Sequence, residues 1–257
     1  MKDDMLVSYT GFEENVVIPP YVDKIGELAF AGCANIKTIT MYKGITHIAR
    51  SAFSCCRSLE KIIRLGVKPS LKYSRDDFII EEQVLKKYIG NNEDVDIPYG
   101  VVRIRCNAFA NCKHVKTVNI PNTVKEIGDG AFYNCNLIES IVLPESVEWL
   151  GERVFNRCRS LKKIKLPLNL TYIGRDSFRD CRLLEDINLP QPLMHIPEDL
   201  FKRCRNLKHI TIPKGVKCIG PFAFGNCHSL KNVEFEGKKE EIGIHTNAFY
   251  NCPFEPF

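Results

Sequence analysis

Apolar residues recur along the chain in a block that repeats about every 23 residues. In the copy that starts at Leu161, apolar and basic residues alternate up to Pro167, which predicts a short strand with Ile164 and Leu166 inward. Proline ends this strand because it donates no backbone hydrogen bond. A second inward pair and a glycine turn follow. The inward groups of Ser177–Cys181, three positions apart, then fit one tight helical turn.

The same alternation predicts a strand in each of the other copies. Stacked copies would pair these strands in parallel, about 4.8 Å apart. The predicted strands are Ile36 to Met41, Leu59 to Ile62, Val115 to Ile120, Ile138 to Leu143, Leu184 to Leu189, Leu207 to Ile212 and Leu230 to Phe235.

Each block ends in a phenylalanine and a cysteine with two free positions between them, and this pair occurs nine times. The step between successive phenylalanines is identical from Phe30 to Phe53 and throughout from Phe109 to Phe224. It is more than doubled between Phe53 and Phe109, and slightly longer between Phe224 and Phe249. A fixed period of this length is typical of a solenoid, in which each repeat packs only on its neighbours. The predicted structural core holds the nine pairs Phe30 and Cys33, Phe53 and Cys56, Phe109 and Cys112, Phe132 and Cys135, Phe155 and Cys158, Phe178 and Cys181, Phe201 and Cys204, Phe224 and Cys227, and Phe249 and Cys252.

The stretch from Val118 to Cys135 resembles the repeat of the BspA-type leucine-rich repeat family, Leu-x-x-Ile-x-Ile-Pro-x-x-Val-x-x-Ile-Gly-x-x-Ala-Phe-x-x-Cys, at almost every position. The resemblance covers nearly the whole chain. It implies a leucine-rich-repeat solenoid: a curved parallel β-sheet of short strands, with turns and short helical turns on the other side. It also implies a binding role without a catalytic motif. Known relatives are mostly bacterial surface or secreted proteins.

The start of the chain matches a later segment at a constant offset. Leu6 corresponds to Leu85, and Tyr9 to Tyr88. We therefore expect a single solenoid domain over residues 1–257 that contains two supermodules, 1–79 and 80–257. An irregular, hairpin-like insert is expected around residues 63–98, with strands at Phe78–Ile80, Val84–Tyr88 and Val95–Ile97.

Two segments lie outside the repeat. Lys68–Asp77 has no apolar periodicity, which predicts an exposed loop. Phe254–Phe257 follows the last cysteine of the repeat and is expected to cover the open end of the core, as solenoid ends require.

Composition excludes little. The net charge of +5, from 36 basic and 31 acidic residues, is mild and does not by itself argue for nucleic acid. No apolar run approaches about 18 residues, so no membrane span is expected. Met1–Leu6 lacks the pattern of a signal peptide. This predicts a cytoplasmic location as the chain stands, or a secreted or cell-surface one if a leader was removed.

Nine of the twelve cysteines occupy one position of the repeat, which predicts a buried ladder of reduced thiols rather than disulfides. No cofactor and no metal site is expected, because nucleotide-binding, metalloprotease and serine-hydrolase motifs are absent. Cys227 and Cys252 have histidines nearby but belong to the core-facing ladder. Three cysteines lie off the ladder: Cys55, Cys106 and Cys218.

Positive charge gathers between Arg153 and Lys208, where thirteen basic residues oppose six acidic ones and leave +7. The remainder of the chain is therefore near −2. The residue after the repeat cysteine is often basic and would form a line along one edge of the solenoid, as at Arg159, Arg182 and Arg205. Such an edge is either a solvated surface balanced by its own acids or a docking surface for an anionic partner.

A second position of the repeat gathers aromatic residues. Trp149, Tyr172 and His195 each precede the inward residue on the far side of the coil, on three consecutive coils, and should point outward. Clustered exposed aromatics mark binding sites more often than scattered ones do. The alternative is that a flanking loop covers them.

These features predict a non-catalytic protein–protein interaction module that binds on the concave face or on the basic edge. The alternative is a binder of an anionic polymer, an acidic glycan or nucleic acid, through the Arg153–Lys208 edge. A contact is expected in the coils where Val154, Ser177 and Leu200 replace the alanine that precedes phenylalanine elsewhere. The candidate contact residues are Trp149, Tyr172, Arg157, Arg159, Lys163, Lys165, Arg179, Arg182, Arg203, Arg205 and Lys208.

Overall fold

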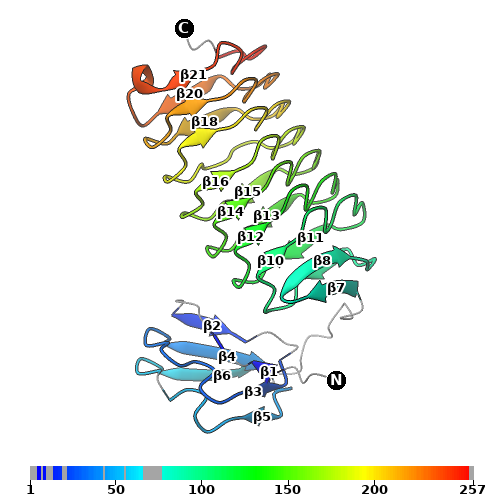
Figure 1. Cartoon of the computed structure of the whole chain (residues 1–257), viewed down its shortest axis with the longest axis vertical. Coiled ribbons are helices and arrows are strands. Elements are labelled where there is room, and N and C mark those ends of the chain that lie inside the picture. Colours follow the sequence, from blue (N-terminus) through cyan, green and yellow to red (C-terminus); the bar gives the residue numbers. More distant parts are fainter. Residues whose placement is uncertain are drawn as a thin grey trace. The chain divides into compact units, whose positions relative to one another are not determined.

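The computed structural model describes residues 5–6, 8–9, 14–18, 22–42, 44–54, 56–65 and 77–254 (Figure 1). The chain divides into two compact units, Met1–Lys72 and Tyr73–Phe257, which we call unit 1 and unit 2. Each unit is a stack of coils whose short strands pair in parallel with those of the next coil. The predicted solenoid is therefore confirmed. That the two units form one continuous domain stays a prediction.

Unit 1 contains two three-stranded parallel sheets. The shortest strands form one sheet, and the longer strands form the other. The first sheet contains β1 (Met5–Leu6), β3 (Lys24–Ile25) and β5 (His47–Ile48), and the second contains β2 (Asn15–Val17), β4 (Thr38–Tyr42) and β6 (Lys61–Leu65).

Unit 2 repeats this arrangement over more coils. The predicted inward pair on the far side of each coil belongs to a short strand of its own rather than only to a turn. These far-side strands are β10 (Arg103–Ile104), β12 (Glu126–Ile127), β14 (Trp149–Leu150), β16 (Tyr172–Ile173), β17 (His195–Ile196), β19 (Cys218–Ile219) and β21 (Gly243–Ile244). The other side of the coils carries β9 (Asp94–Asp96), β11 (Thr117–Asn119), β13 (Ser140–Val142), β15 (Lys163–Lys165), β18 (His209–Ile212) and β20 (Asn232–Phe235).

One predicted strand is wrong. Between β15 and β18, the segment Leu184–Leu189 forms no strand, although Ile187 and Leu189 are buried as expected. The alternation therefore identified the inward side chains correctly but not the hydrogen-bonded ladder.

The first coils of the two units share one strand register. Met5 pairs with Lys24, and Val84 pairs with Arg103 at the same separation along the chain. This separation is shorter than in later coils, where Arg103 pairs with Glu126. In both units the first coil also places a tyrosine where later coils place phenylalanine. Tyr88 stacks on Phe109 at 5.0 Å between ring centroids.

A hairpin opens unit 2, as predicted. β7 (Phe78–Glu81) pairs antiparallel with β8 (Val84–Tyr88). Glu82 and Gln83 connect them with φ of 48° and 64°, the positive values that a tight hairpin turn requires. The expected loop at Lys68–Asp77 lies outside the described residues except for Asp77.

The core of unit 2 is a column of aromatic rings. From Phe109 to Phe249 each phenylalanine lies 4.9–5.8 Å from the next and nearly parallel to it. Phe254 closes the column edge-on at 5.0 Å from Phe249, as expected of the tail, while residues 255–257 lie outside the described part. The paired core is buried except at Phe53, Cys56 and Cys252, which lie in the last coil of their unit and are partly exposed.

The cysteine ladder follows the aromatic column and is made of free thiols among the described residues. From Cys135 onward each Sγ donates to the backbone carbonyl of the phenylalanine one coil earlier, for example Cys158 to Phe132 at 3.1 Å and Cys181 to Phe155 at 3.1 Å. Burial raises the pKa of these thiols well above its usual value. The repeat therefore selects cysteine because it is small and apolar and still satisfies a carbonyl.

The expected helical turn at Ser177–Cys181 is wrong. The described part of each coil shows successive hydrogen-bonded turns there, closed by bonds such as that from the Cys181 amide to the Phe178 carbonyl. In the turns from Phe109 to Phe224 two positions have positive φ, one shortly before phenylalanine and one shortly after it, as at Asp176 (59°) and Asp180 (61°). Between them the Phe178 amide donates to the Leu200 carbonyl of the next coil, so the turns form a ladder of their own.

The glycine that follows the far-side strand also has a different role from the one expected. Gly174 has no positive φ; a Cβ at this position would lie 2.5 Å from backbone atoms of Gly151 and Glu152. Glycine is required here because adjacent coils approach each other closely.

Candidate functional site

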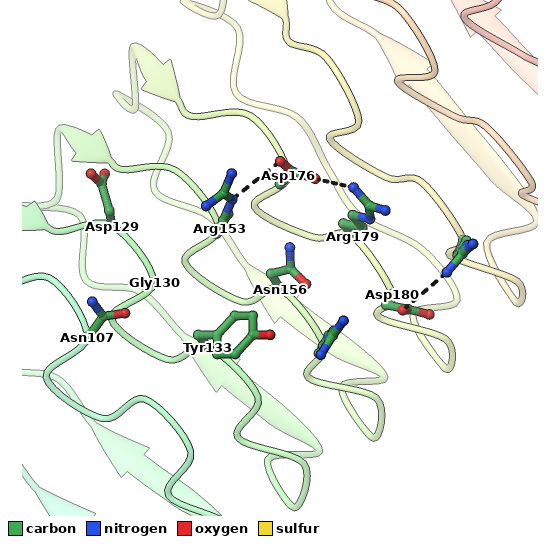
Figure 2. A pocket seen from close by; sticks show the side chains of 11 residues that line it. Asn107, Asp129, Gly130, Tyr133, Arg153, Asn156, Asp176, Arg179 and Asp180 are labelled. Atoms are coloured by element: carbon green, nitrogen blue, oxygen red, sulfur yellow. Dashed lines mark hydrogen bonds and ion pairs between the residues drawn. The ribbon is translucent and has the colours of Figure 1, made fainter.

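A polar groove of about 490 Å³ lies over the stacked turns of unit 2 (Figure 2). It spans five coils, from Asn107 to Arg203. We call it the arginine groove. It is lined by Asn107, Asp129, Gly130, Tyr133, Arg153, Asn156, Arg157, Asp176, Arg179, Asp180 and Arg203.

The turn geometry explains why these positions line the groove. Phenylalanine and the residue before it face the core, and Val154, Ser177 and Leu200 are all fully buried. The two positive-φ positions and the residue directly after phenylalanine face the groove instead. In consecutive coils these positions hold Arg153, Asn156 and Arg157, and then Asp176, Arg179 and Asp180. Val154, Ser177 and Leu200, which stand where other coils have alanine, therefore alter only the core. A partner could contact only the residues adjacent to them in the sequence.

Three carboxylates form the base of the charged network. Asp176, Asp180 and Asp199 expose only 7%, 5% and 7% of their surface. Buried acids of this kind must be paired with a cation or hydrogen-bonded. Arg179 bridges two of them, with Nη1 3.0 Å from Asp176 and 2.8 Å from Asp199. Burial opposes the charge on Arg179, but its hydrogen bond to Asp176 and the charges of Asp199 and Asp176 raise its pKa overall.

Other arginines of the groove keep free hydrogen-bonding capacity. Arg153 and Arg203 lie only at the limit of ion pairing, 3.6 Å from Asp176 and 4.0 Å from Asp180. Arg157 has no acidic partner among the described residues; its guanidinium lies 5.8 Å from the centre of the Tyr133 ring. All three side chains are at least partly exposed. The arrangement is thus a paired layer of acids beneath arginines that are available to an anion.

An exposed aromatic pair lies on the neighbouring sheet of the same coils. Trp149 and Tyr172 are register partners in β14 and β16, and their rings stack at 5.6 Å with 6° between planes. They expose 36% and 45% of their surface, so no described segment covers them. Trp149 precedes Arg153 by four residues, so the two Cα atoms lie within about 14 Å of each other. The aromatic pair therefore belongs to the strands that lead into the turns lining the groove.

The other predicted contact residues are divided between the turn edge and the opposite sheet. Arg182 binds the buried Asp180 at 3.0 Å. Lys163 and Lys165 belong to β15, on the other sheet, where Lys165 pairs with Glu145 at 3.3 Å. Three residues have no ion pair in the described part of the chain: Arg159 and Arg205, which follow repeat cysteines, and Lys208, which directly precedes β18. The predicted Arg153–Lys208 edge is thus not one surface, and only Arg157, Arg179 and Arg203 of the candidate residues line the groove.

Sequence reasoning missed the carboxylate layer and Tyr133. A signal for the groove was present, because the positive-φ positions of neighbouring coils hold Asn107, Asn111, Gly130 and Asn134. Asparagine, aspartate and glycine are the residues that tolerate this conformation. Reading that column would have located the turn surface.

Two further observations concern the described residues only. No three histidine, cysteine, aspartate or glutamate side chains come together in a way that could hold a metal ion. No helix in this part of the chain is long and apolar enough to cross a membrane.

Comparison with known proteins identifies the repeat. The model of the BspA type leucine rich repeat region matches six copies, over residues 8–72, 79–208 and 194–257. No curated protein matches.

Solved structures are also similar. A leucine-rich repeat protein of T. pallidum is 28% identical, with a TM-score of 0.61 over 64% of this chain and 83% of that one. A leucine-rich repeat protein from Eubacterium ventriosum is 20% identical, with a TM-score of 0.59 over 95% and 78%. One from Bacteroides ovatus is 24% identical, with a TM-score of 0.55 over 93% and 61%.

Proposed function

Because the chain belongs to the BspA-type leucine-rich repeat family, whose members are typically non-catalytic protein-interaction modules, we propose that unit 2 binds a protein partner through an acidic segment. The segment lies along the arginine groove, and an apolar side chain of the partner packs on Trp149 and Tyr172. The observation that carries this proposal is the row of exposed arginines above buried, already paired carboxylates.

The groove favours carboxylates for a geometric reason. Nη1 of Arg179 already donates hydrogen bonds to Asp176 and Asp199. Arg157 and Arg203 keep most of their N–H donors free. A guanidinium donates in a planar fork that matches a carboxylate. Five coils about 4.8 Å apart extend over about 19 Å, which is the length of about six extended residues. A short acidic segment therefore fits the groove.

The aromatic pair adds apolar contact area, which the charged groove lacks. Exposed charges contribute more to the rate and specificity of association than to affinity, although a reversed charge repels an acidic segment. Stacked, solvent-exposed aromatic rings on a rigid strand pair supply the apolar contact that interface hot spots usually need. The proposal therefore requires both surfaces, which distinguishes a protein partner from an anionic polymer.

The test measures binding of a fluorescent peptide that carries six glutamates and one tryptophan. Heparin and a single-stranded oligonucleotide serve as polymer probes. We expect the double variant Arg157→Glu and Arg203→Glu to lose most peptide binding, and Trp149→Ala with Tyr172→Ala to weaken it about tenfold or more. The matched control is Lys163→Glu with Lys231→Glu, which changes the net charge equally but uses exposed lysines away from the groove.

Two outcomes contradict the proposal. If the control pair weakens the peptide as much as the groove pair does, binding follows net charge and not the groove. If heparin or the oligonucleotide binds much more tightly than the peptide, with a steep dependence on salt and no effect of the aromatic variants, the anionic-polymer alternative replaces it.

A further inference from the structure

Two residues of the far-side sheet form a cysteine–histidine pair that the proposed function does not use. His195 in β17 and Cys218 in β19 are register partners in adjacent parallel strands. Their neighbours Ile196 and Ile219 are buried, so His195 and Cys218 face outward. Nδ1 of His195 lies 3.0 Å from Sγ of Cys218. The fold therefore holds an imidazole nitrogen against a thiol on the surface of the coil stack.

Cys218 is accessible to small reagents. It is only partly buried, and His195 is exposed. Its register partner in the next coil is Gly243, which has no side chain to cover the sulfur from that side. A reagent can thus approach Sγ from the side opposite the imidazole.

The other described cysteines differ in the groups around the sulfur. In the ladder, Sγ donates to a phenylalanine carbonyl, as in Cys204 to Phe178 at 3.1 Å, and burial raises the pKa of Cys204. A buried neutral thiol of this kind is inert, because the thiolate is the reactive form. Cys106 is exposed but has no base hydrogen-bonded to it in the described part. Cys252 is partly exposed, and its hydrogen bond with Cys227 lowers its pKa, which makes it the rival thiol.

We propose that Cys218, assisted by His195, is a site of thiol modification that reacts with low-molecular-weight disulfides. His195 accepts the thiol proton at Nδ1, and the Cys218 thiolate attacks one sulfur of the small disulfide. The disulfide bond of the reagent breaks as the Cys218–sulfur bond forms. The departing thiolate takes the proton from His195 and leaves as a thiol. Cys218 is oxidised to a mixed disulfide, and the reagent is reduced by the same two electrons.

The pair is suited to this single reaction rather than to catalytic turnover. Among the described residues, no acidic side chain is hydrogen-bonded to His195, so nothing fixes its orientation as the third group of a catalytic triad does. The adduct would project from the far-side sheet, at the repeat position that holds Trp149 and Tyr172 in earlier coils. Modification would therefore change the surface beyond the aromatic pair.

The reaction with 5,5′-dithiobis(2-nitrobenzoate) tests the proposal, with the modified peptides located by mass spectrometry. We expect one fast thiol at Cys218, reacting on the order of tenfold faster than Cys106 because His195 lies 3.0 Å from Sγ and can take the thiol proton as the sulfur attacks. Cys218→Ser should remove the fast phase, whereas Cys106→Ser and Cys252→Ser should leave it. Glutathione disulfide should give a mixed disulfide at the same residue.

His195→Gln separates the role of the base from that of a polar neighbour. Glutamine keeps a hydrogen-bonding side chain at position 195 but takes up no proton, so the fast phase should slow to the rate of Cys106. Thermal unfolding of this variant checks that the fold is unchanged. The proposal is overturned if His195→Gln reacts as fast as the unaltered protein, or if the fast phase maps to a cysteine other than Cys218.

Discussion

The turns beside the arginine groove are built differently in two neighbouring regions of unit 2. In the coils around Phe109 and Phe132, which we call the amide turns, the positive-φ positions hold Asn107, Asn111, Gly130 and Asn134. In the coils from Phe155 to Phe201, which we call the charged turns, the same positions hold Arg153, Arg157, Asp176, Asp180, Asp199 and Arg203. The backbone is equivalent in both regions, so the difference lies in the side chains alone.

The amide turns use residues that suit the backbone. Asparagine and glycine tolerate positive φ, and Asn134 donates to Asn111 at 2.7 Å across adjacent coils. Arginine has no such tolerance, and a left-handed conformation costs it about 1–2 kcal/mol. Charged turns must also pair their buried carboxylates. The comparison shows that neither the arginines nor the aspartates are required by the coil, which supports a role for them in binding.

The amide and charged turns lie over the same scaffold, which includes the cysteine ladder. The ladder gives the prediction with the largest expected effect. Burial raises the folded-state pKa of six thiols along the ladder, at Cys112, Cys135, Cys158, Cys181, Cys204 and Cys227. A raised folded pKa stabilises the fold fully below the unfolded pKa of about 8.5, and this stability is lost as pH rises above it.

Each such thiol should remove up to about 1.4 kcal/mol of unfolding free energy per pH unit once the unfolded chain is deprotonated. Six together predict cooperative alkaline unfolding within about one pH unit above the unfolded pKa. Circular dichroism against pH measures this. Cys181→Ala should make the dependence shallower by about one sixth. A stability that does not change between pH 8 and about pH 10 would contradict a ladder of buried thiols.

The aromatic column gives the next largest effect and should not distinguish the regions. Phe132 underlies the amide turns and Phe178 the charged turns, and both are fully buried in stacked contacts. Phe132→Ala and Phe178→Ala should each lower the free energy of unfolding by about 3–5 kcal/mol through lost transfer energy and a cavity. Urea denaturation measures both. A difference of more than about 1 kcal/mol between them would mean that the charged turns contribute to the core.

Sequence pattern was sufficient for the scaffold because the scaffold is periodic. The Phe-x-x-Cys spacing identified the core column, and apolar alternation identified the inward residues even where Leu184–Leu189 forms no ladder. The prediction of a helical turn was wrong because inward groups three positions apart fit a helical turn and a pair of successive β-turns equally well. Only the asparagine, aspartate and glycine at the flanking positions distinguish the two.

The groove was predicted only in part, for a different reason. Arg157, Arg179 and Arg203 were identified as basic residues of one edge, but the pattern does not show which cations are already neutralised. That depends on contacts between coils, such as that of Arg179 with Asp199 at 2.8 Å. Lys163 and Lys165 were grouped with them by their charge, although the apolar alternation already predicted the strand that carries them, which is β15.

Arg157→Asn makes a charged turn resemble an amide turn, and it has the smallest expected effect. Arg157 has φ of 65° and no acidic partner among the described residues. Asparagine should relieve the strain at this position, and only a weak cation–π contact with Tyr133 opposes the gain. We expect a net increase of about 0.5 kcal/mol in the free energy of unfolding, together with weaker binding of the acidic peptide. The matched control is Arg159→Asn, which removes the same charge at a nearby position where φ is not positive, and it should give no gain. Equal changes in both variants would show that Arg157 carries no conformational cost, and the distinction between the amide and charged turns would then be one of charge alone.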